Sequence, residues 1–374
     1  MPPLAQRNLF HDKIRLTVTL TGIVFAVVLI VVELGLFVGF TTTTSGLVDH
    51  SQADLWVTSR RVPYVELAVP FSERKLYQVR AVAGVAEAQK VISRWGQWKR
   101  ADGRDESVQV LGVSPESSME QPWNLVQGSA DDLRKPDAVI MDEMYKEKLG
   151  VHHAGEIFEI NGRRARVVGF TRGIRSFTTS PYVFTTFKRA QEYVNLPDDQ
   201  TIFVLVKLAP GANVEQVRQG ILSSVANVDV FTSRQFSHMT QFYWMFTTGA
   251  GVAVLLAALL GLVVGFVVVA QTIYATTMDH LREYGTLKAM GAPNTYVYKV
   301  IIQQAAMSAA MGYVLGMIVS AFVVHASQSG GAAILLPWPM AVGMFFLTLA
   351  MCVGAALVSI SKVTSLDPAM VFKG

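Results

Sequence analysis

Four long apolar segments divide the chain, and each one exceeds the length that a membrane-spanning helix needs. They cover residues 16–40, 242–273, 297–324 and 339–360. A helix crosses roughly 30 Å of hydrocarbon with about 20 residues, so each segment predicts a transmembrane helix. The first follows Arg7, Lys13 and Arg15, as in a signal peptide. Its apolar run is too long for one, and TTTTSG stands where a small-residue cleavage site belongs, so we interpret it as an uncleaved span.

The long polar stretch of residues 41–241 consists of short apolar runs separated by turn signals. We expect strands near residues 54–57, 91–99, 107–113, 138–141, 156–160, 164–170, 182–185, 202–208 and 228–231. We expect helices near residues 74–83, 142–149, 188–194 and 214–225. Asn161-Gly162 is a strong hairpin signal. The predicted fold class is an α-helical membrane protein with four transmembrane helices and a mixed α+β extracytoplasmic domain inserted between helices 1 and 2.

Lysine and arginine are distributed unevenly over the short polar segments. They occur in the amino-terminal segment 1–15, in the loop 274–296 and in the tail 361–374, whereas the loop 325–338 has none. Because positive loops stay on the cytoplasmic side, both termini and loop 274–296 are expected in the cytoplasm. Residues 41–241 and the loop 325–338 are then outside.

Two helices are expected where polar segments meet the spans. Residues 1–15 hold apolar side chains among polar ones, which fits an amphipathic helix on the membrane surface or a disordered basic tail. Aromatic residues at 242–244 predict an interfacial belt at the start of the second span. If helix begins near Ser233, it forms one continuous rod from the outer domain through the bilayer.

Composition agrees with a membrane protein that carries one sizeable aqueous domain. Hydrophobic residues make up 51% of the chain and charged residues 16%, and the mean hydropathy is +0.36. The net charge of +4 is scattered rather than gathered in the basic stripe that nucleic-acid binding needs. The single cysteine, Cys352, lies in an apolar run, so the chain has no internal disulfide framework.

No motif for nucleotide, metal or hydrolytic chemistry occurs in the sequence. It contains no GxxxxGK[ST] phosphate loop, no HExxH and no GxSxG. His152 and His153 are adjacent, so they cannot share a helix face, and neither a cysteine nor a third histidine supports a metal site there. We therefore expect no catalytic residues, no metal and no cofactor bound by this chain itself.

Glu33 and two glycine pairs stand out within the spans. A carboxylate in a membrane helix is costly, so Glu33 indicates either a substrate contact or a structural hydrogen bond to a Gln, Ser or Tyr of another span. The pairs Gly261/Gly265 and Gly312/Gly316 form GxxxG patterns that permit close backbone approach. Whether they pack within one chain or between two chains is open at this point.

The segment MDHLREYGTLKAMGA of residues 278–292 is the most informative polar stretch. Gly291 followed by Pro293 is a helix stop. Tyr284, Leu287 and Met290 recur at three-residue steps on one helix face. The helix-compatible polar residues are Asp279, Arg282, Glu283 and Lys288. This pattern predicts a short amphipathic helix at the membrane surface that docks on a soluble partner.

The stretch REYGTLKAMGA resembles the E-x-G-x-L-[KR]-A-x-G-A core of FtsX-like ABC permeases. That superfamily includes MacB, the lipoprotein-releasing permeases, the haem exporter HrtB and the cyanobacterial DevC group. The family's amino terminus, outer-domain start and carboxyl-terminal D-P-x-x-A ending are similar to residues 6–15, 53–57 and 366–369 here. The resemblance covers the whole chain in topology and is nearest to DevC and HrtB, without the fused ATPase domain of MacB.

The resemblance implies a bacterial plasma-membrane permease that acts as a homodimer with two copies of a separate ATPase. ATP and Mg would bind to that ATPase. The coupling helix that contacts it would contain Asp279, Arg282, Glu283, Tyr284, Leu287, Lys288 and Met290. Closure of the ATPase would move the coupling helices, and this motion would be passed outward by mechanotransmission. Substrate would be handled at the outer face rather than drawn through a central channel. A periplasmic membrane-fusion adaptor is a further partner that the resemblance implies.

The shared motifs leave the cargo open. A haem exporter would form an outer-leaflet haem site from Glu33, Phe40 and Tyr243, whereas a DevC-like protein would pass a glycolipid or another envelope product to its adaptor. The alternative from another class is an FtsX-like signalling scaffold, which activates an extracytoplasmic partner without moving cargo. A sensor and a membrane enzyme are disfavoured, because the chain has two more spans than a sensor needs and no catalytic constellation.

Overall fold

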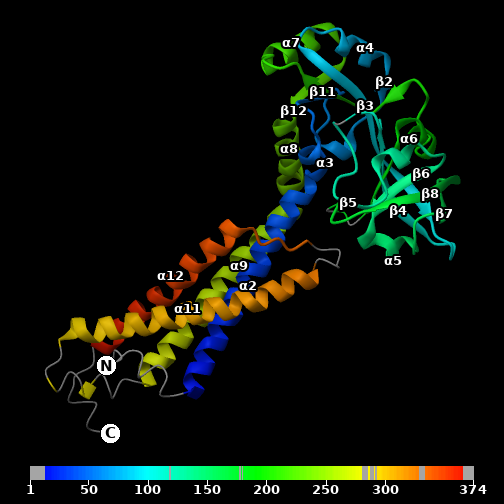
Figure 1. Cartoon of the computed structure of the whole chain (residues 1–374). Helices are drawn as coiled ribbons and strands as arrows, with labels where there is room; N and C mark the ends of the chain where they lie inside the picture. Colours follow the sequence, from blue (N-terminus) through cyan, green and yellow to red (C-terminus); the bar gives the residue numbers. More distant parts are fainter. Residues whose placement is uncertain are drawn as a thin grey trace. The chain divides into compact units, whose positions relative to one another are not determined.

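The computed structural model describes residues 13–117, 119–176, 178, 180–279, 285–286, 290, 293–327 and 333–364. The chain divides into two compact units (Figure 1). The first, which we call the helical unit, consists of Met1–Gly39 and Val252–Gly374. The second, the α+β unit, is Phe40–Gly251.

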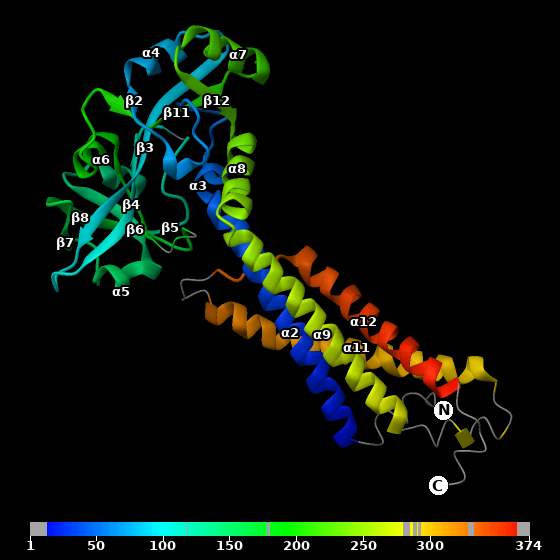
Figure 2. The same cartoon turned by 180° about the vertical axis from the view of Figure 1, so that it is seen from behind.

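The helical unit contains four long helices, each long and apolar enough to cross a membrane. They are α2 (Lys13–Thr44), α9 (Ala250–Asp279), α11 (Asn294–Ser327) and α12 (Trp338–Thr364). α2, α11 and α12 begin and end outside the spans expected from hydropathy, because helix continues past the apolar core into polar residues. α9 also ends beyond the expected residue 273, but it begins at Ala250 and not at residue 242, so the expected start of the second span is wrong. α2 lies beside α9 in both views of the molecule (Figures 1 and 2).

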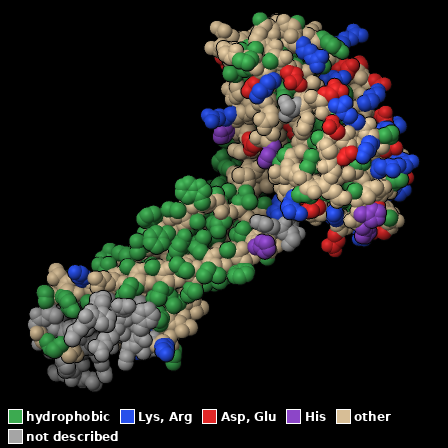
Figure 3. Space-filling view, viewed as in Figure 1, with side chains coloured by type: hydrophobic (Ala, Val, Ile, Leu, Met, Phe, Trp, Pro, Cys, Tyr) green, Lys and Arg blue, Asp and Glu red, His purple; other side chains and the backbone are tan. Residues whose placement is uncertain are grey.

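The surface of the helical unit is apolar. Leu260, Val263 and Phe322 expose half or more of their side chains, and hydrophobic side chains cover the helices in Figure 3. Charged side chains gather instead on the α+β unit. A soluble protein does not expose apolar surface of this extent, whereas lipid tails would cover it.

The α+β unit is built on a 10-stranded sheet with the order β12-β1-β11-β3-β4-β9-β6-β8-β5, in which β7 pairs with β3 and β8. Its strands are β1 (Leu55–Ser59), β3 (Val85–Lys99), β4 (Asp105–Val113), β5 (Leu125–Gln127), β6 (Ala138–Asp142), β7 (Ile157–Ile160), β8 (Arg163–Thr171), β9 (Tyr182–Thr186), β11 (Phe203–Leu208) and β12 (Val228–Thr232). A second, two-stranded sheet pairs β2 (Phe71–Ser72) with β10 (Gln200–Thr201).

Short helices flank this sheet. They are α3 (Gly46–His50), α4 (Arg74–Arg80), α5 (Lys146–Leu149), α6 (Phe187–Tyr193), α7 (Val214–Ser224) and α8 (Ser233–Phe242). Three 3-10 turns, η1 (Val65–Leu67), η2 (Ala130–Arg134) and η3 (Glu143–Tyr145), complete the connections. The mixed α+β class predicted for this part of the chain is confirmed.

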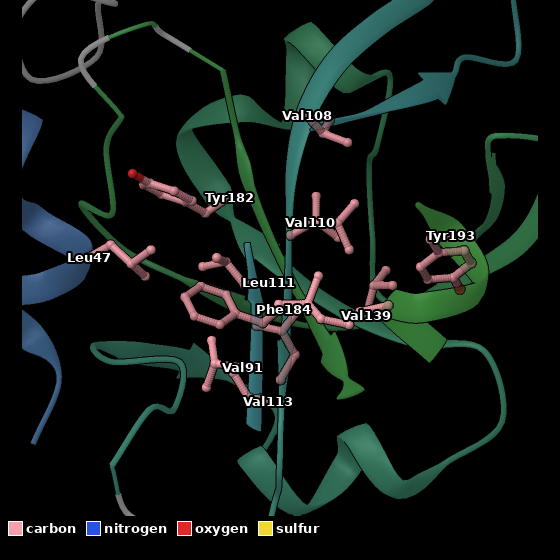
Figure 4. Packing of buried hydrophobic residues seen from close by; sticks show 14 of the residues in the cluster. Leu47, Val91, Val108, Val110, Leu111, Val113, Val139, Tyr182, Phe184 and Tyr193 are labelled. Carbon is pink, nitrogen blue, oxygen red and sulfur yellow. The ribbon is translucent and has the colours of Figure 1, made fainter. Parts of the chain in front are cut away.

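Two apolar clusters hold the α+β unit together. The larger one reaches from Tyr193 on α6 across β4, β6 and β9 to Tyr182 and to Leu47 on α3 (Figure 4). The smaller one lies between α4, α7 and the β1-β11-β12 end of the sheet, and includes Val79 and Ile221. Burial of these side chains removes apolar surface from water, which is the main driving force of the fold.

Local turn chemistry behaves as the sequence predicts. Asn161 and Gly162 have φ angles of 49° and 75° and join the antiparallel strands β7 and β8. Both positions of a type I′ turn need a positive φ, which Asn and Gly adopt at low cost. Gly150 ends α5 in the left-handed region, with φ 69°, as a helix C-cap.

The continuous rod expected from Ser233 onward is wrong. Helix does begin at Ser233, where Thr232 and Gln235 form a capping box. However, Tyr243–Thr247 is a π-helical turn, η4, and Gly249 has a φ of +76°, so α9 starts only at Ala250. A left-handed residue cannot continue an α-helix, which is why the rod is interrupted.

Candidate functional site

The predicted coupling segment is described only in part. Asp279 ends α9, Gly285 and Thr286 are helical, and the Met290 N–H donates to the Thr286 carbonyl over 3.0 Å. Met290 is 72% exposed. Five predicted coupling residues lie outside the described residues: Arg282, Glu283, Tyr284, Leu287 and Lys288.

Three contacts join the end of α9 to the start of α2. Arg15 Nε lies 3.5 Å from Asp279 Oδ2, and the hydroxyls of Thr19 and Thr276 are 3.0 Å apart. The ion pair is about half exposed, so it contributes at most about 1 kcal/mol. One turn further along, a Cβ at Gly22 would lie 2.7 Å from Thr272 Oγ1, so the two backbones approach closely. The end of α9 nearest the coupling segment is therefore attached to α2.

Both predicted glycine pairs lie against α2. A Cβ at Gly265 would lie 3.0 Å from Ile30 Cδ1, and one at Gly261 would lie 3.1 Å from Glu33 Cγ. On a neighbouring face of α2, a Cβ at Gly312 would lie 2.4 Å from Ile23 Cγ2, and one at Gly316 would lie 2.8 Å from the Val27 side chain. The α2 residues in these contacts, Ile23, Val27 and Ile30, are buried. These contacts are within one chain, so α2 is the helix on which α9 and α11 pack.

A third glycine pair was not singled out from the sequence. A Cβ at Gly39 would lie 1.8 Å from the Ala333 carbonyl oxygen, and the Leu335 N–H donates to the Gly35 carbonyl over 3.1 Å. The segment before α12 therefore lies directly on the α2 backbone. This pair could have been predicted from the sequence, because residues 35–39 have the same GxxxG pattern as the other two pairs.

The three residues of the hypothetical haem site have separate surroundings. The stem of Glu33 packs over Gly261, and Phe40 is half-buried near the end of α2. The ring of Tyr243 stacks on Tyr64 within the α+β unit, with centroids 4.1 Å apart. The haem site stays a prediction. Within the described part of the chain, no group of three His, Cys, Asp or Glu side chains could hold a metal ion.

Asp142 fixes one end of the large sheet. Its carboxylate accepts from the backbone N–H of Ile174 at 2.7 Å, from that of Met144 at 3.1 Å and from the Thr171 hydroxyl at 3.1 Å. Burial raises the pKa of Asp142, and these hydrogen bonds oppose that rise. This side chain thus ties the end of β6 to the end of β8 and to the loop before β9.

Within the described residues, four helices are long and apolar enough to cross a membrane, and the α+β unit is inserted after the first of them, an arrangement that fits a permease subunit of a membrane transporter. Residues 16–223 match the MacB-like periplasmic core domain, and residues 255–368 match the FtsX-like permease C-terminal domain. The chain belongs to the MacB/FtsX family of ABC transporter permeases.

Similar proteins include an uncharacterized ABC transporter permease of Mycobacterium tuberculosis strain H37Rv, 24% identical over 384 residues and 99% of both chains. A permease of Mycobacterium bovis is 24% identical over 383 residues, again covering 99% of both chains. Among solved structures, the periplasmic region of MacB from Actinobacillus actinomycetemcomitans aligns with a TM-score of 0.38 and 12% identity, covering 50% of this chain and 92% of that one. The extracellular domain of the transporter YknZ from Gram-positive bacteria aligns with a TM-score of 0.35 and 10% identity, covering 48% and 99%.

Proposed function

We propose that this ABC permease is the membrane-spanning subunit of an exporter that works by mechanotransmission. Two copies of a separate ATPase would bind ATP and Mg and would seat on the segment 279–290 of a homodimer of this chain. Both termini and that segment would lie in the cytoplasm of a bacterial cell. Closure of the ATPase would move the helices, and the α+β unit would respond outside, alone or with a membrane-fusion adaptor.

The close packing around α2 is the observation that supports this proposal. Asp279 at the end of α9 pairs with Arg15, and the Gly261/Gly265 pair lets the rest of α9 lie on α2. Packed protein interiors have low compressibility and transmit displacement instead of absorbing it. A push on the end of α9 would therefore move α2 with it, along helices that reach both unit boundaries.

The substrate would be a hydrophobic molecule such as haem, a lipid or a glycolipid. Glu33 is the carboxylate within the described apolar span of α2, and a polar group at that depth is costly unless it has a role. Its stem is held over Gly261, so the position of its carboxyl depends on the packing of α2 against α9. Substrate contact at Glu33 would thereby be linked to helix movement.

The test is co-purification of the tagged full chain from native membranes in mild detergent, followed by an ATPase assay of the complex. We expect an ATPase to co-purify, and Glu283→Arg or Leu287→Asp to abolish stimulated hydrolysis while membrane insertion stays normal. Glu159→Arg, the same charge reversal at a half-exposed position of the α+β unit, is the matched control and should leave stimulation unchanged. Unchanged stimulation in both Glu283→Arg and Leu287→Asp would refute the assignment of the coupling segment.

A further inference from the structure

The last turns of the α+β unit have a geometry that an ordinary helix avoids. The backbone N–H of Thr248 donates to the Tyr243 carbonyl over 3.1 Å, which closes the π turn η4. Gly249 follows with a left-handed φ of +76°. Single π turns within helices are rare and are frequent at functional sites. A left-handed glycine adds backbone freedom at the same place.

Aromatic rings connect this π turn to a distant part of the sequence. Tyr64, directly before η1, stacks on Tyr243 with a centroid distance of 4.1 Å and an interplanar angle of 18°. The same ring stands edge-on to Trp244, with a centroid distance of 5.3 Å. We call Tyr64, Tyr243 and Trp244 the aromatic clamp. The clamp holds the turn η1 against the π turn, so a charge placed beside these rings affects both turns.

Glu66 is the ionisable group beside the clamp. Its Oε2 atom is fully buried and has no hydrogen-bond partner within the described residues. Desolvation raises the pKa of Glu66 from 4.5 to about 7, and its interactions with its own backbone N–H and with Trp244 oppose that rise. No cationic side chain of the described residues is among the groups that act on this pKa.

The other groups that face this region are also acids or phenols. Tyr64, directly before η1, interacts electrostatically with Tyr243 of the π turn and with Glu66. Glu66 also interacts with Tyr182 of β9. Burial raises the pKa of Tyr182, and the nearby Glu66, Tyr145 and Glu120 raise it further. Glu120 is itself buried, and neither carboxyl oxygen has a partner within the described residues. Arg175 interacts electrostatically with Tyr145, but it is not among the groups that act on the pKa of Glu66.

We propose that Glu66 and the aromatic clamp form a proton-operated switch on the π turn. With a neutral Glu66, the carboxyl stays buried, Tyr64 remains stacked on Tyr243, and η4 is held in place. When Glu66 loses its proton, the carboxylate draws in water, Tyr64 leaves Tyr243, and the segment 243–249 is released. The switch would make the end of the α+β unit rigid in an acidic medium and mobile in a neutral or alkaline one. It depends on this unit alone and not on the ATPase partner.

The sign of the pH effect follows from linkage. The closed state binds the proton more tightly, since its pKa of about 7 exceeds the 4.5 of an exposed glutamate. The closed state is therefore favoured at low pH, and its population falls as the pH rises toward 7. For these two pKa values, opening increases about tenfold between about pH 6 and about pH 8.

The experiment is hydrogen–deuterium exchange of the full chain in nanodiscs, followed over the peptide that contains Thr248, with rates corrected for intrinsic exchange chemistry. We expect the corrected exchange to rise about tenfold from about pH 6 to about pH 8 in the wild type. Glu66→Gln, a neutral residue of the same shape, should keep the protected state throughout. Glu116→Gln, at a carboxyl that is 79% exposed, is the control and should behave like the wild type.

A second variant keeps the test decisive if Glu66→Gln does not fold. Trp244→Phe removes a group that favours the ionised carboxyl, so the midpoint of the exchange transition should move to higher pH. A purely structural role of Trp244 would raise exchange at every pH without moving the midpoint. Wild-type exchange with no pH dependence beyond the intrinsic one, or a pH dependence retained in Glu66→Gln, would overturn the switch.

Discussion

Replacing Gly312 by alanine tests the packing of α11 on α2 at its tightest point. The new Cβ would lie 2.4 Å from Ile23 Cγ2 and 2.8 Å from Ile23 Cβ. Ile23 is fully buried, so its side chain has no free space to turn into. Since carbon atoms pack at roughly 3.5–4.0 Å, the two helices must separate by about 1 Å to accept the methyl group.

The expected cost can be isolated with a matched glycine. Overpacking of a well-filled interior costs about 1–3 kcal/mol, and alanine gains about 1 kcal/mol over glycine in helix propensity. Gly354 on α12 is also helical, but a Cβ there has nothing within 4 Å. Gly354→Ala should therefore gain the helix propensity of alanine without a steric clash. We expect Gly312→Ala to be less stable than Gly354→Ala by about 1–3 kcal/mol.

The assay is reversible unfolding of the full chain by SDS in mixed micelles, followed by circular dichroism. A double variant adds a second readout, since Ile23→Ala removes Cγ2, the atom that the new methyl group would approach most closely, and leaves only Cβ in its way. The two substitutions should then be non-additive, with a favourable coupling of about 0.5–3 kcal/mol in the double variant. Equal stabilities of Gly312→Ala and Gly354→Ala, or simple additivity with Ile23→Ala, would refute the packing argument.

Two further predictions concern single carboxylates. If haem is the cargo, haem titration should shift the Soret band with wild-type protein and much less with Glu33→Ala, and a wild type without any shift would eliminate haem. Asp142→Ala should lower the free energy of unfolding of the α+β unit by about 2–4 kcal/mol, because it leaves buried donors unpaired. Asp131→Ala, at a side chain that is 78% exposed, is its control in thermal denaturation, and equal losses in the two variants would contradict the role of Asp142.

Features that depend on neighbouring residues were predictable from the sequence. The turn at Asn161-Gly162 follows from the φ angles that these two residues adopt, and the four spans follow from hydropathy alone. The parallel pairing of β4 with β9 and of β6 with β8 was not predictable, since it joins strands far apart in the chain. The interruption at Gly249 was also missed, because a π turn has no simple periodic pattern.

The candidate site also has features that the sequence predicts and features that only the structure reveals. The coupling segment stays a prediction from spacing and motif, whereas the ion pair between Arg15 and Asp279 is visible only once two helices meet. Gly261 and Gly312 could be named as close-packing positions, but only the structure identifies α2 as their common neighbour. Glu66 gave no signal, because its chemistry comes from burial beside Trp244, which lies far along the chain.

The position of α2 among the other helices has a consequence for biogenesis. The chain from Ser45 to Gly249 separates α2 from the first helix that packs on it. At a synthesis rate of about 5–20 residues per second, α2 stays in the bilayer for roughly 10–40 s before α9 emerges. During this time Glu33 and the glycine backbone at Gly35 and Gly39 face lipid or an insertion factor instead of their final neighbours. A ribosome that stalls inside the α+β unit would therefore leave α2 in the bilayer without the helices that cover it.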